Sequence, residues 1–509
     1  MKLNKTKNTT RNVVFGSILK IYQILLPFAF RSVMIYTLGV QYLGLNSLFS
    51  SVLQVLNLAE LGVGSAMVFS MYKPIVEDDT YTICALLNLY KVYYRIIGSV
   101  ICVIGLICTP FIPHLINGEV PKDINVYVLY LLNLAGTVLT YWLFSYKSSI
   151  FNAYQRLDIT SKISIITDSV KYILQFIALV AFKNYYYFVL AMLLSQIIYN
   201  CVVAFAATKM YPEYKATGKL SKTERKEINK RILDLFTSKV GGTIVSSADT
   251  LVISAFLGLE ILAIYQNYFY ILNAVMAFIM IINNSAVAGI GNSMITDSLE
   301  KNYEDFEVFN FLEFWIMGFC VCCFSALFQP FMEIWMGRDL MFPYAMVLLF
   351  CAYFWGFEIE KMLSVFKDAG GIWHEDRFRP FIYGIANLIL NIIIVQYIGI
   401  YGVVLSTIVT VFFISLPWII HNVFALIYKR SPIPYVKRVC KYTIITCVTM
   451  AINYVICSFV PGNLIISFVL KCCICVVVPN VIFIIIYRNN PLFEKSKQLA
   501  FKIIKKKNK

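Results

Sequence analysis

The chain has 509 residues, of which 59% are hydrophobic and only 14% are charged, and its formal net charge is +16. Its mean hydropathy of +0.73 lies far above the range of soluble domains, which excludes a soluble enzyme or a soluble binding module. The composition therefore predicts an all-α protein that crosses a membrane many times.

Apolar segments long enough to cross a bilayer occur along the whole chain. A spanning helix needs about 20 mostly apolar residues. By this measure the sequence predicts fourteen spans, at 14–37, 45–70, 95–117, 125–146, 163–182, 186–208, 235–257, 261–290, 309–330, 342–363, 380–399, 401–425, 438–460 and 464–487. Because the number is even, both ends of the chain should lie on the same side of the membrane.

Basic residues set the expected orientation. They gather in the N-terminus, in KLSKTERKEINKR at 219–231 and in the tail KIIKKKNK, whereas the opposite side offers only Lys122, Lys183 and Arg338. Loops on the cytoplasmic side are enriched in Lys and Arg, so we expect both termini to be cytoplasmic. The first apolar segment is too long and too charged for a cleavable signal peptide, so we expect it to remain as an anchor. The positive charge then predicts contact with anionic lipid and no nucleic-acid partner.

The loops argue against several enzyme classes. The predicted outer loops are short and hold no inserted domain. Lipid-dependent glycosyltransferases and polymerases need paired carboxylates, usually in sizeable outer loops, so we expect no enzyme activity. The cysteine clusters at 320–323 and 472–475 lie inside predicted spans, where cysteine acts as a small apolar residue, so we expect neither a metal nor another cofactor.

One inner segment predicts an interfacial helix. In 77–97, Asp79 or Thr80 can cap a helix whose apolar residues share one face, namely Ile83, Leu86, Leu87 and Tyr90. Such a helix is typical of a segment lying on the inner leaflet.

An internal repeat indicates two halves. A shift of 219 residues places Lys20 on Lys239 and Leu38-Gly39 on Leu257-Gly258. This pattern predicts an N-terminal six-helix bundle at 1–215, a C-terminal six-helix bundle at 216–430, and two extra spans with a basic tail at 431–509. Because six is even, the halves have the same orientation, as in parallel-repeat transporters.

Charged residues inside the predicted spans are the candidate functional residues, because such charges are costly in lipid and usually face a protein interior or a hydrated cavity. Lys20 and Arg31 are eleven residues apart, which returns to nearly the same helix face. We predict that the cations bind substrate, namely Arg31, Lys20, Lys239 and Lys171. We predict that the acids couple an ion or balance these charges, namely Asp249, Glu60 and Asp168.

Each candidate also has a structural interpretation. Lys20 and Arg31 can extend to the nearest interface, and Asp168 and Lys171 can form a purely structural pair. Asp249 and Glu60 can be held by Ser or Thr, or stay protonated. At the cytoplasmic end of the tenth predicted span we expect solvated charges, namely Glu358, Glu360 and Lys361. The three histidines lie near loops or helix ends and are poor catalytic candidates, namely His114, His374 and His421.

Two blocks of sequence resemble a known family. The segment YLGLNSLFSSVLQVLNLAELGVGSAMVFSMYKPI, at 42–75, resembles the first-to-second helix region of bacterial polysaccharide and O-antigen flippases. The segment FKDAGGIWHEDRFRPFIYGIANLILNIIIVQYIGIYGVVLSTI, at 366–408, resembles their cytoplasmic loop and helices eleven and twelve. These proteins belong to the multidrug/oligosaccharidyl-lipid/polysaccharide exporter (MOP) superfamily. Arg31, Lys20, Lys239 and the loop 374–380 are the positions where the family pattern can be matched.

The resemblance implies two six-helix bundles around a central V-shaped cavity, with two further C-terminal helices. It also implies a flippase in the bacterial cytoplasmic membrane. The expected substrate is an undecaprenyl-pyrophosphate-linked oligosaccharide, moved to the outer leaflet by ion-driven alternating access for surface polysaccharide biosynthesis. The expected partners are this lipid-linked oligosaccharide, membrane lipids, and polysaccharide polymerase and glycosyltransferases.

Three other functions stay open. A multidrug exporter of the same superfamily would favour carboxylates in its cavity, because its substrates are often cations. A membrane glycosyltransferase or polymerase would need a loop-borne acidic pair. A scaffold of a cell-wall complex would have no use for charges inside its spans. The intramembrane cations favour the flippase, because fixed Lys and Arg replace the water contacts that a pyrophosphate loses.

Overall fold

The computed structural model describes residues 5–498, without the side chains of 5–10, 13, 237–239, 285 and 288. This part of the chain is helical throughout and contains no strand, which confirms the all-α prediction. Its first half comprises α1 (Lys5–Thr37), α2 (Val40–Leu56), α3 (Val63–Val76), α4 (Thr80–Cys108), α5 (Val126–Trp142), α6 (Ser148–Ala153), α7 (Leu157–Val180), α8 (Tyr185–Met210) and α9 (Lys222–Leu257). Its second half comprises α10 (Leu259–Thr296), α11 (Leu299–Met336), α12 (Tyr344–Ala369), α13 (Trp373–Asp376), α14 (Arg379–Ile398), α15 (Ile400–Thr410), α16 (Leu416–Asn422), α17 (Ile433–Ser458) and α18 (Leu464–Tyr487).

Within the described residues, eleven helices are long and apolar enough to cross a membrane, or thirteen if two bent helix pairs each count as one span. The remaining predicted span, 342–363, corresponds to α12. This helix is long enough to cross a membrane, but it is not counted among the apolar helices because it carries Glu358, Glu360 and Lys361. The chain is thus a multi-pass membrane protein.

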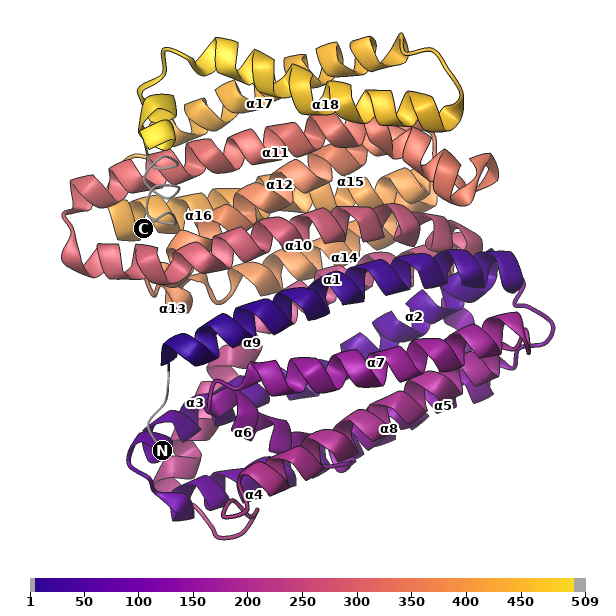
Figure 1. Cartoon of the computed structure of the whole chain (residues 1–509), viewed down its shortest axis with the longest axis vertical. Helices are drawn as coiled ribbons and strands as arrows, with labels where there is room; N and C mark the ends of the chain where they lie inside the picture. Colours follow the sequence, from indigo (N-terminus) through magenta and orange to yellow (C-terminus); the bar gives the residue numbers. More distant parts are fainter. Residues whose placement is uncertain (1–4, 499–509) are drawn as a thin grey trace. The chain divides into compact units, whose positions relative to one another are not determined.

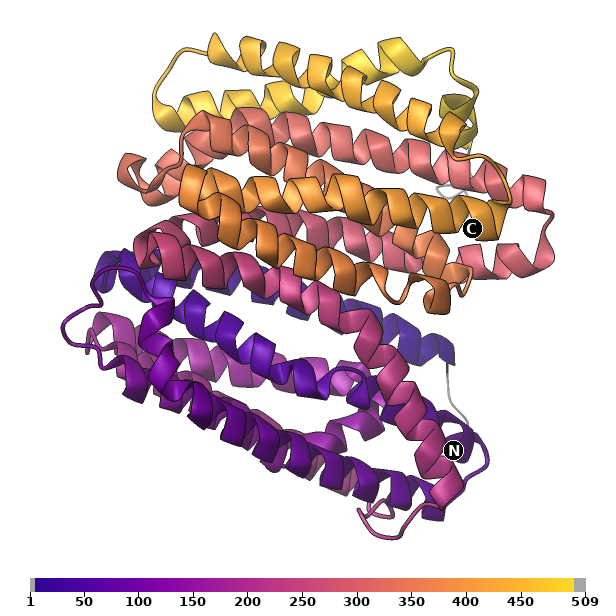
Figure 2. The same ribbon diagram turned by 180° about the vertical axis from the view of Figure 1, so that it is seen from behind.

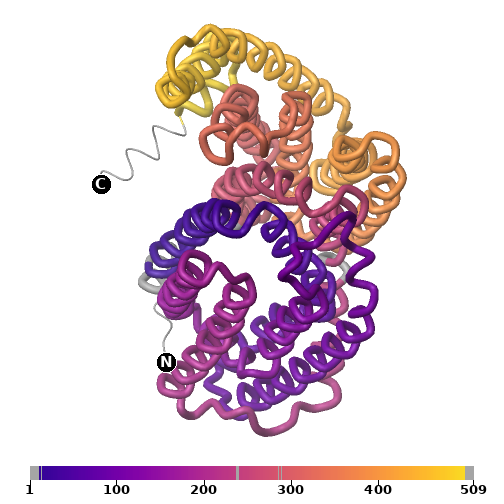
Figure 3. Tube along the Cα trace, turned by 90° about the vertical axis from the view of Figure 1, so that its right-hand side faces the viewer, coloured from indigo at the N-terminus to yellow at the C-terminus, as the bar shows by residue number. Residues whose placement is uncertain are grey.

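The chain forms two compact units, Met1–Ala263 and Ile264–Lys509. The helices of the first unit close into a ring of neighbours, seen end-on in Figure 3, in the order α1, α7, α8, α5, α4, α3, α9, α2 and back to α1. Because α9 packs on α2 and α3, its contacts belong to the first unit. The three-part division at 215 and 430 stays a prediction.

The second unit is built around α11 and α12. In Figure 1, α17 and α18 lie along α11, and both contact it. On its other sides α12 packs against α15 and α16, and the reverse view in Figure 2 shows α14 beside α15. The helix that begins with α15 continues through α16 to Tyr428, and it contains two π-helical stretches, Val411–Ser415 and Val423–Tyr428. As a result, α12 is surrounded by protein although it carries charges.

Two glycines aligned by the repeat occupy equivalent junctions. Gly39 joins α1 to α2 with φ 123°, and Gly258 joins α9 to α10 with φ 90°. Side chains rarely adopt these left-handed values, so glycine permits the turn between two long helices.

The predicted interfacial helix is part of a longer element. Asp79 does cap it, because the Thr82 N–H donates to Asp79 Oδ1 at 3.0 Å, and the predicted apolar face is buried. However, α4 continues without a break from Thr80 to Cys108, so the prediction of a separate helix on the membrane surface was wrong. The basic segment 219–231 is also helical from Lys222 onward, since Ser221 and Glu224 form a capping box that starts α9.

Candidate functional site

A band of polar side chains joins α1 to α7 in the first unit. Tyr22 and Ser169 share a hydrogen bond of 2.7 Å, and Gln23 Nε2 donates to Asp168 Oδ2 at 3.5 Å. The Lys171 ammonium donates to Asp168 Oδ1 at 2.6 Å. We call these five residues the α1–α7 polar band.

Aromatic rings border this band. The Lys171 ammonium lies 4.4 Å from the centre of the Tyr172 ring, which also packs against Tyr22 and Phe30. Lys171 and Asp168 are 20% and 18% exposed, so the pair is shielded but still accessible. The predicted ion pair is therefore present, and it leaves a route for an external anion to reach the lysine.

The two cations of α1 lie on the same helix face as the band. Gln23 lies three residues after Lys20, and Arg31 lies eight residues after Gln23, so helical spacing puts them in one stripe. Lys20 is exposed and Arg31 is half-buried. The structure thus brings Lys20, Arg31, Asp168 and Lys171 onto two adjoining helices.

The candidates on α9 are placed differently. Asp249 is buried within α9. Lys239 also falls in α9, but its side chain lies outside the described residues. The pairing of Lys239 with substrate therefore stays a prediction.

Glu60 ends a short 3-10 turn, Asn57–Glu60, at the break between α2 and α3, where these helices bend by 40°. Tyr90 donates to the Tyr94 hydroxyl at 2.6 Å, and Tyr94 donates to Glu60 Oε1 at 3.0 Å. A pair of tyrosines therefore holds Glu60 on α4.

Two glycines that follow this break permit close packing. Gly62 has φ 91°, and a β-carbon there would lie 2.8 Å from Leu235 Cβ and 2.9 Å from the Ile232 carbonyl oxygen of α9. At Gly64 a β-carbon would lie 3.0 Å from the Tyr90 hydroxyl and 3.2 Å from Glu60 Oε1. The break thus brings Glu60 to α4 and brings the chain against α9.

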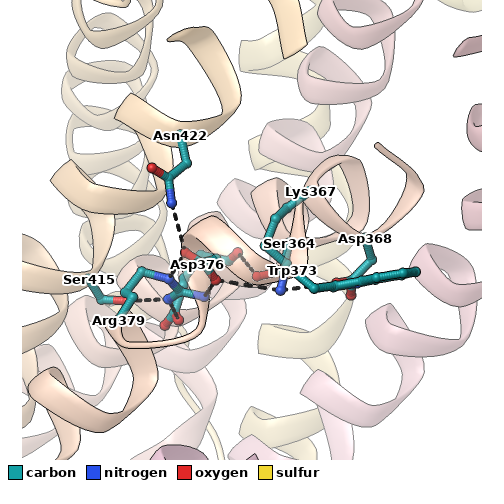
Figure 4. Close-up of polar contacts among 9 residues, drawn as sticks. Ser364, Lys367, Asp368, Trp373, Asp376, Arg379, Ser415 and Asn422 are labelled. Atoms are coloured by element: carbon teal, nitrogen blue, oxygen red, sulfur yellow. Dashed lines mark hydrogen bonds and ion pairs between the residues drawn. The ribbon is translucent and has the colours of Figure 1, made fainter. Parts of the chain in front are cut away.

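A second polar cluster lies inside the second unit and was not predicted as such (Figure 4). The Arg379 guanidinium binds both oxygens of Asp376, donates to Ser415 Oγ at 2.6 Å, and also bonds to Glu360. Asn422 donates to Asp376 at 3.2 Å. These contacts join α12, α13, α14 and α16 in one buried network.

The expectation that Glu358 and Glu360 are solvated was wrong. Glu358 is fully buried and Glu360 nearly so, whereas Lys361 is 33% exposed and lies 3.3 Å from Glu358. The physical reason is the packing around α12, whose neighbours α11, α15 and α16 bury the side of the helix that carries Glu358 and Glu360. The signal was in the sequence, because three charges in an otherwise apolar helix need internal partners.

Among the residues that the structure describes, no group of three or more His, Cys, Asp or Glu side chains is arranged to hold a metal ion.

The comparisons with known proteins bear on the fold. No family model and no curated protein matches the chain. Among solved structures, the lipid II flippase MurJ in an inward closed conformation superposes with a TM-score of 0.63 at 16% identity, covering 94% of this chain and 99% of that one. An inward-facing MATE-family multidrug resistance transporter of the MOP superfamily gives 0.63 at 16% identity, covering 80% and 98%. A MOP superfamily transporter from Pyrococcus furiosus, described by a reversed polarity of its binding pocket, gives 0.50 at 14% identity, covering 82% and 96%.

The chain has the MOP fold.

This fold confirms the all-α fold class that the two sequence blocks implied, while the count of fourteen spans and the central cavity stay predictions. In this MOP-fold chain the second block, 366–408, contains the ion pair of Asp376 and Arg379. The first block, 42–75, contains the Glu60 break. Both blocks thus coincide with places where polar side chains connect different helices.

Proposed function

We propose that this chain is a flippase. It moves an undecaprenyl-pyrophosphate-linked oligosaccharide from the inner to the outer leaflet by ion-gradient-driven alternating access, and so supplies surface polysaccharide biosynthesis. One observation carries the proposal: at the α1–α7 polar band, the cations Lys20, Arg31 and Lys171 outnumber the band's one carboxylate, Asp168. The other carboxylate of α7, Asp158, is buried and already paired with Arg11 and Arg156. A site with net positive charge inside membrane-length helices suits an anionic headgroup.

The chemistry of this face fits a pyrophosphate. The phosphate groups lose water contacts when they leave the aqueous phase, and lysine and arginine donors replace those contacts. The side chains around Lys171 add hydroxyl and amide groups from Tyr22, Gln23 and Ser169, which suit hydrogen bonding to sugar hydroxyls. The prenyl tail can stay in lipid while the headgroup passes. The fold shared with a lipid II flippase supports the same class of substrate.

The proposal includes a location and an orientation. We place the protein in the bacterial cytoplasmic membrane with both termini on the cytoplasmic side, because the basic segments of the sequence fall on that side. Transport of this kind needs no covalent chemistry from the chain.

A multidrug exporter is the second candidate, since the fold is shared with MATE transporters. The observation in its favour is the pair of acids away from the α1–α7 polar band, namely the buried Asp249 and the tyrosine-bound Glu60. Cationic drugs would favour those carboxylates, whereas a lipid pyrophosphate would favour the cations of α1 and α7.

The test uses proteoliposomes containing a fluorescent lipid-pyrophosphate-linked oligosaccharide, and measures how fast its headgroup becomes accessible from the other side. We expect the wild type to accelerate exposure under a pH or sodium gradient, and Arg31→Ala and Lys171→Ala to remove most of this acceleration. Lys73→Ala is the matched control, because Lys73 is an exposed lysine of α3 that is paired with Glu77. No exposure above empty liposomes under any gradient, together with efflux of organic cations, would identify a drug exporter instead.

A further inference from the structure

The second unit contains two buried carboxyl groups that do not belong to the α1–α7 polar band. Glu313 of α11 is 2% exposed and Glu358 of α12 is 0% exposed. The two carboxyl groups lie close enough for their charges to interact. In each of them the Oε2 atom is buried and has no hydrogen-bond partner among the described residues. A buried polar atom without a partner costs free energy, so this arrangement needs an occupant or a function.

Glu358 forms an ion pair with a lysine, whereas Glu313 has no ion pair among the described residues. The Lys361 ammonium lies 3.3 Å from Glu358 Oε1, and the lysine side chain is 33% exposed, so it connects the buried pair with the surface of the unit. Cys320, seven residues after Glu313 on α11, is half-buried and interacts electrostatically with both carboxyl groups.

Two arginines on the surrounding helices are engaged with other carboxylates. Arg438 of α17 pairs with Glu307 at 2.5 Å, and Arg379 of α14 bonds to Glu360 and Asp376. His421 of α16 lines a largely apolar cavity of about 670 Å³ together with Ile359. Tyr442 of α17 and Tyr487 of α18 pack on Phe311, and α15 carries no charged residue.

Two like charges in one buried site cannot both ionise without a large cost. One Lys361 charge compensates one carboxylate, and the second carboxyl group remains. A proton on Glu313 neutralises it and supplies a hydrogen-bond donor where two oxygens lack partners. A metal cation fits less well, because Lys361 repels it and a thiol is a poor ligand for a hard cation.

We propose that Glu313 and Glu358 form a proton-binding site in which Glu313 carries the proton and the Glu358–Lys361 pair connects it to water. Resting on the proposed function, this site is where a proton gradient drives transport: Glu313 takes up one proton in one conformation and releases it in the other. The coupling residues thus lie on α11 and α12 instead of among the acids predicted from sequence.

The binding step is tested without any substrate, on the full-length purified protein, by infrared spectroscopy of the C=O stretch of protonated carboxyl groups at neutral pH. We expect Glu313→Gln to remove one component of this band. Glu227→Gln, at an exposed position of α9, should leave the band unchanged. An unchanged band in a folded Glu313→Gln variant would overturn the proposal.

A second variant covers the case in which Glu313→Gln does not fold. Lys361→Gln removes the charge that keeps Glu358 ionised, so we expect the protonated-carboxyl band to grow and to persist to more alkaline pH. A band with the same intensity and pH dependence as the wild type would contradict the role of Lys361 and overturn the site.

The coupling step is tested in proteoliposomes with the lipid-linked oligosaccharide. We expect Glu313→Gln to lose stimulation by a pH gradient while it retains gradient-free headgroup exchange. Full stimulation in this variant would overturn the coupling role. If the wild type exposes no headgroup under any gradient, the proposed function fails, while the infrared result still decides whether the proton site exists.

Discussion

Arg379 and Asp376 form a two-point ion pair inside the second unit, in which Nε donates to Oδ1 at 2.8 Å and Nη2 donates to Oδ2 at 2.9 Å. Both side chains are almost fully buried. The same guanidinium bonds to Glu360 and Ser415, so one side chain connects α12, α13, α14 and the π-helical stretch Val411–Ser415. This arginine therefore fixes the geometry of the loop between α12 and α14.

Arg379→Ala should destabilise the protein strongly, because it leaves Asp376 and Glu360 buried without their cation; the cost of breaking such a pair is about 3 to 5 kcal/mol. Arg379→Lys keeps the charge but loses the two-point geometry, so we expect an intermediate loss. Thermal unfolding of the purified protein in detergent measures both. Arg377→Ala is the control, since Arg377 stacks on the neighbouring Phe378 ring. Equal melting temperatures for Arg379→Ala and Arg377→Ala would show that the network is not stabilising.

The Asp168–Lys171 pair can be separated into its structural and functional parts. Because both side chains are partly exposed, we expect the pair to contribute no more than about 1 kcal/mol to stability. In headgroup exposure, Lys171→Ala should slow transport, whereas Asp168→Ala should not, since it leaves the lysine unneutralised. A purely structural pair would instead give equal losses of transport in both variants. A double-mutant cycle on melting temperature supplies the structural part.

Gly62→Ala should impair folding more than Gly64→Ala. At Gly62 an alanine meets both an unfavourable left-handed φ, worth about 1 to 2 kcal/mol, and close contact with the backbone of α9. At Gly64 the nearest atoms belong to tyrosine and glutamate side chains, which can shift. The measurement is the yield of monodisperse protein and its melting temperature. Similar behaviour of the two variants would mean that α9 moves freely away from the break.

Asp79 should make the start of α4 sensitive to pH. Hydrogen bonds from Thr82 hold the pKa of the Asp79 carboxyl below its ordinary value. A carboxyl with a lowered folded-state pKa stabilises the fold fully above its ordinary pKa, and this contribution disappears as the pH falls through the lowered value. Asp79→Ala should therefore lower the melting temperature at neutral pH, with a difference that narrows on acidification. Asp79→Asn keeps a capping side chain that does not titrate, so we expect its melting temperature to lie above that of Asp79→Ala. Equal melting temperatures of the two variants would show that the cap bond is unimportant.

Much of the fold could be predicted because the membrane restricts the alternatives. Each predicted span falls on a helix or on a bent helix pair, since backbone groups in lipid must be satisfied within helices or closed barrels. Local rules found the Asp79 cap and the buried face of α4, but they did not find its continuation, because an amphipathic start and an apolar span form one helix without any break residue. The capping box of Ser221 and Glu224 is a local signal for a helix start that the sequence analysis missed, because the segment 219–231 was interpreted only as a basic cytoplasmic segment.

The sequence by itself determined that this chain is an all-helical, multi-pass membrane protein with costly charges inside its spans, because apolar length and charge are properties of single segments. It also determined the Asp168–Lys171 pair, whose two residues lie one turn apart on one helix. Only the tertiary structure decided which polar side chains meet across helices: Gln23 with Asp168, Tyr94 with Glu60, and Arg379 with Glu360. It also decided that Glu313 and Glu358 are both buried in the second unit. Helical spacing gives the face on which a side chain lies, but the neighbour on that face depends on packing between helices far apart in the sequence. For that reason the sequence predicted that Glu358 and Glu360 are solvated, whereas both are buried in the fold.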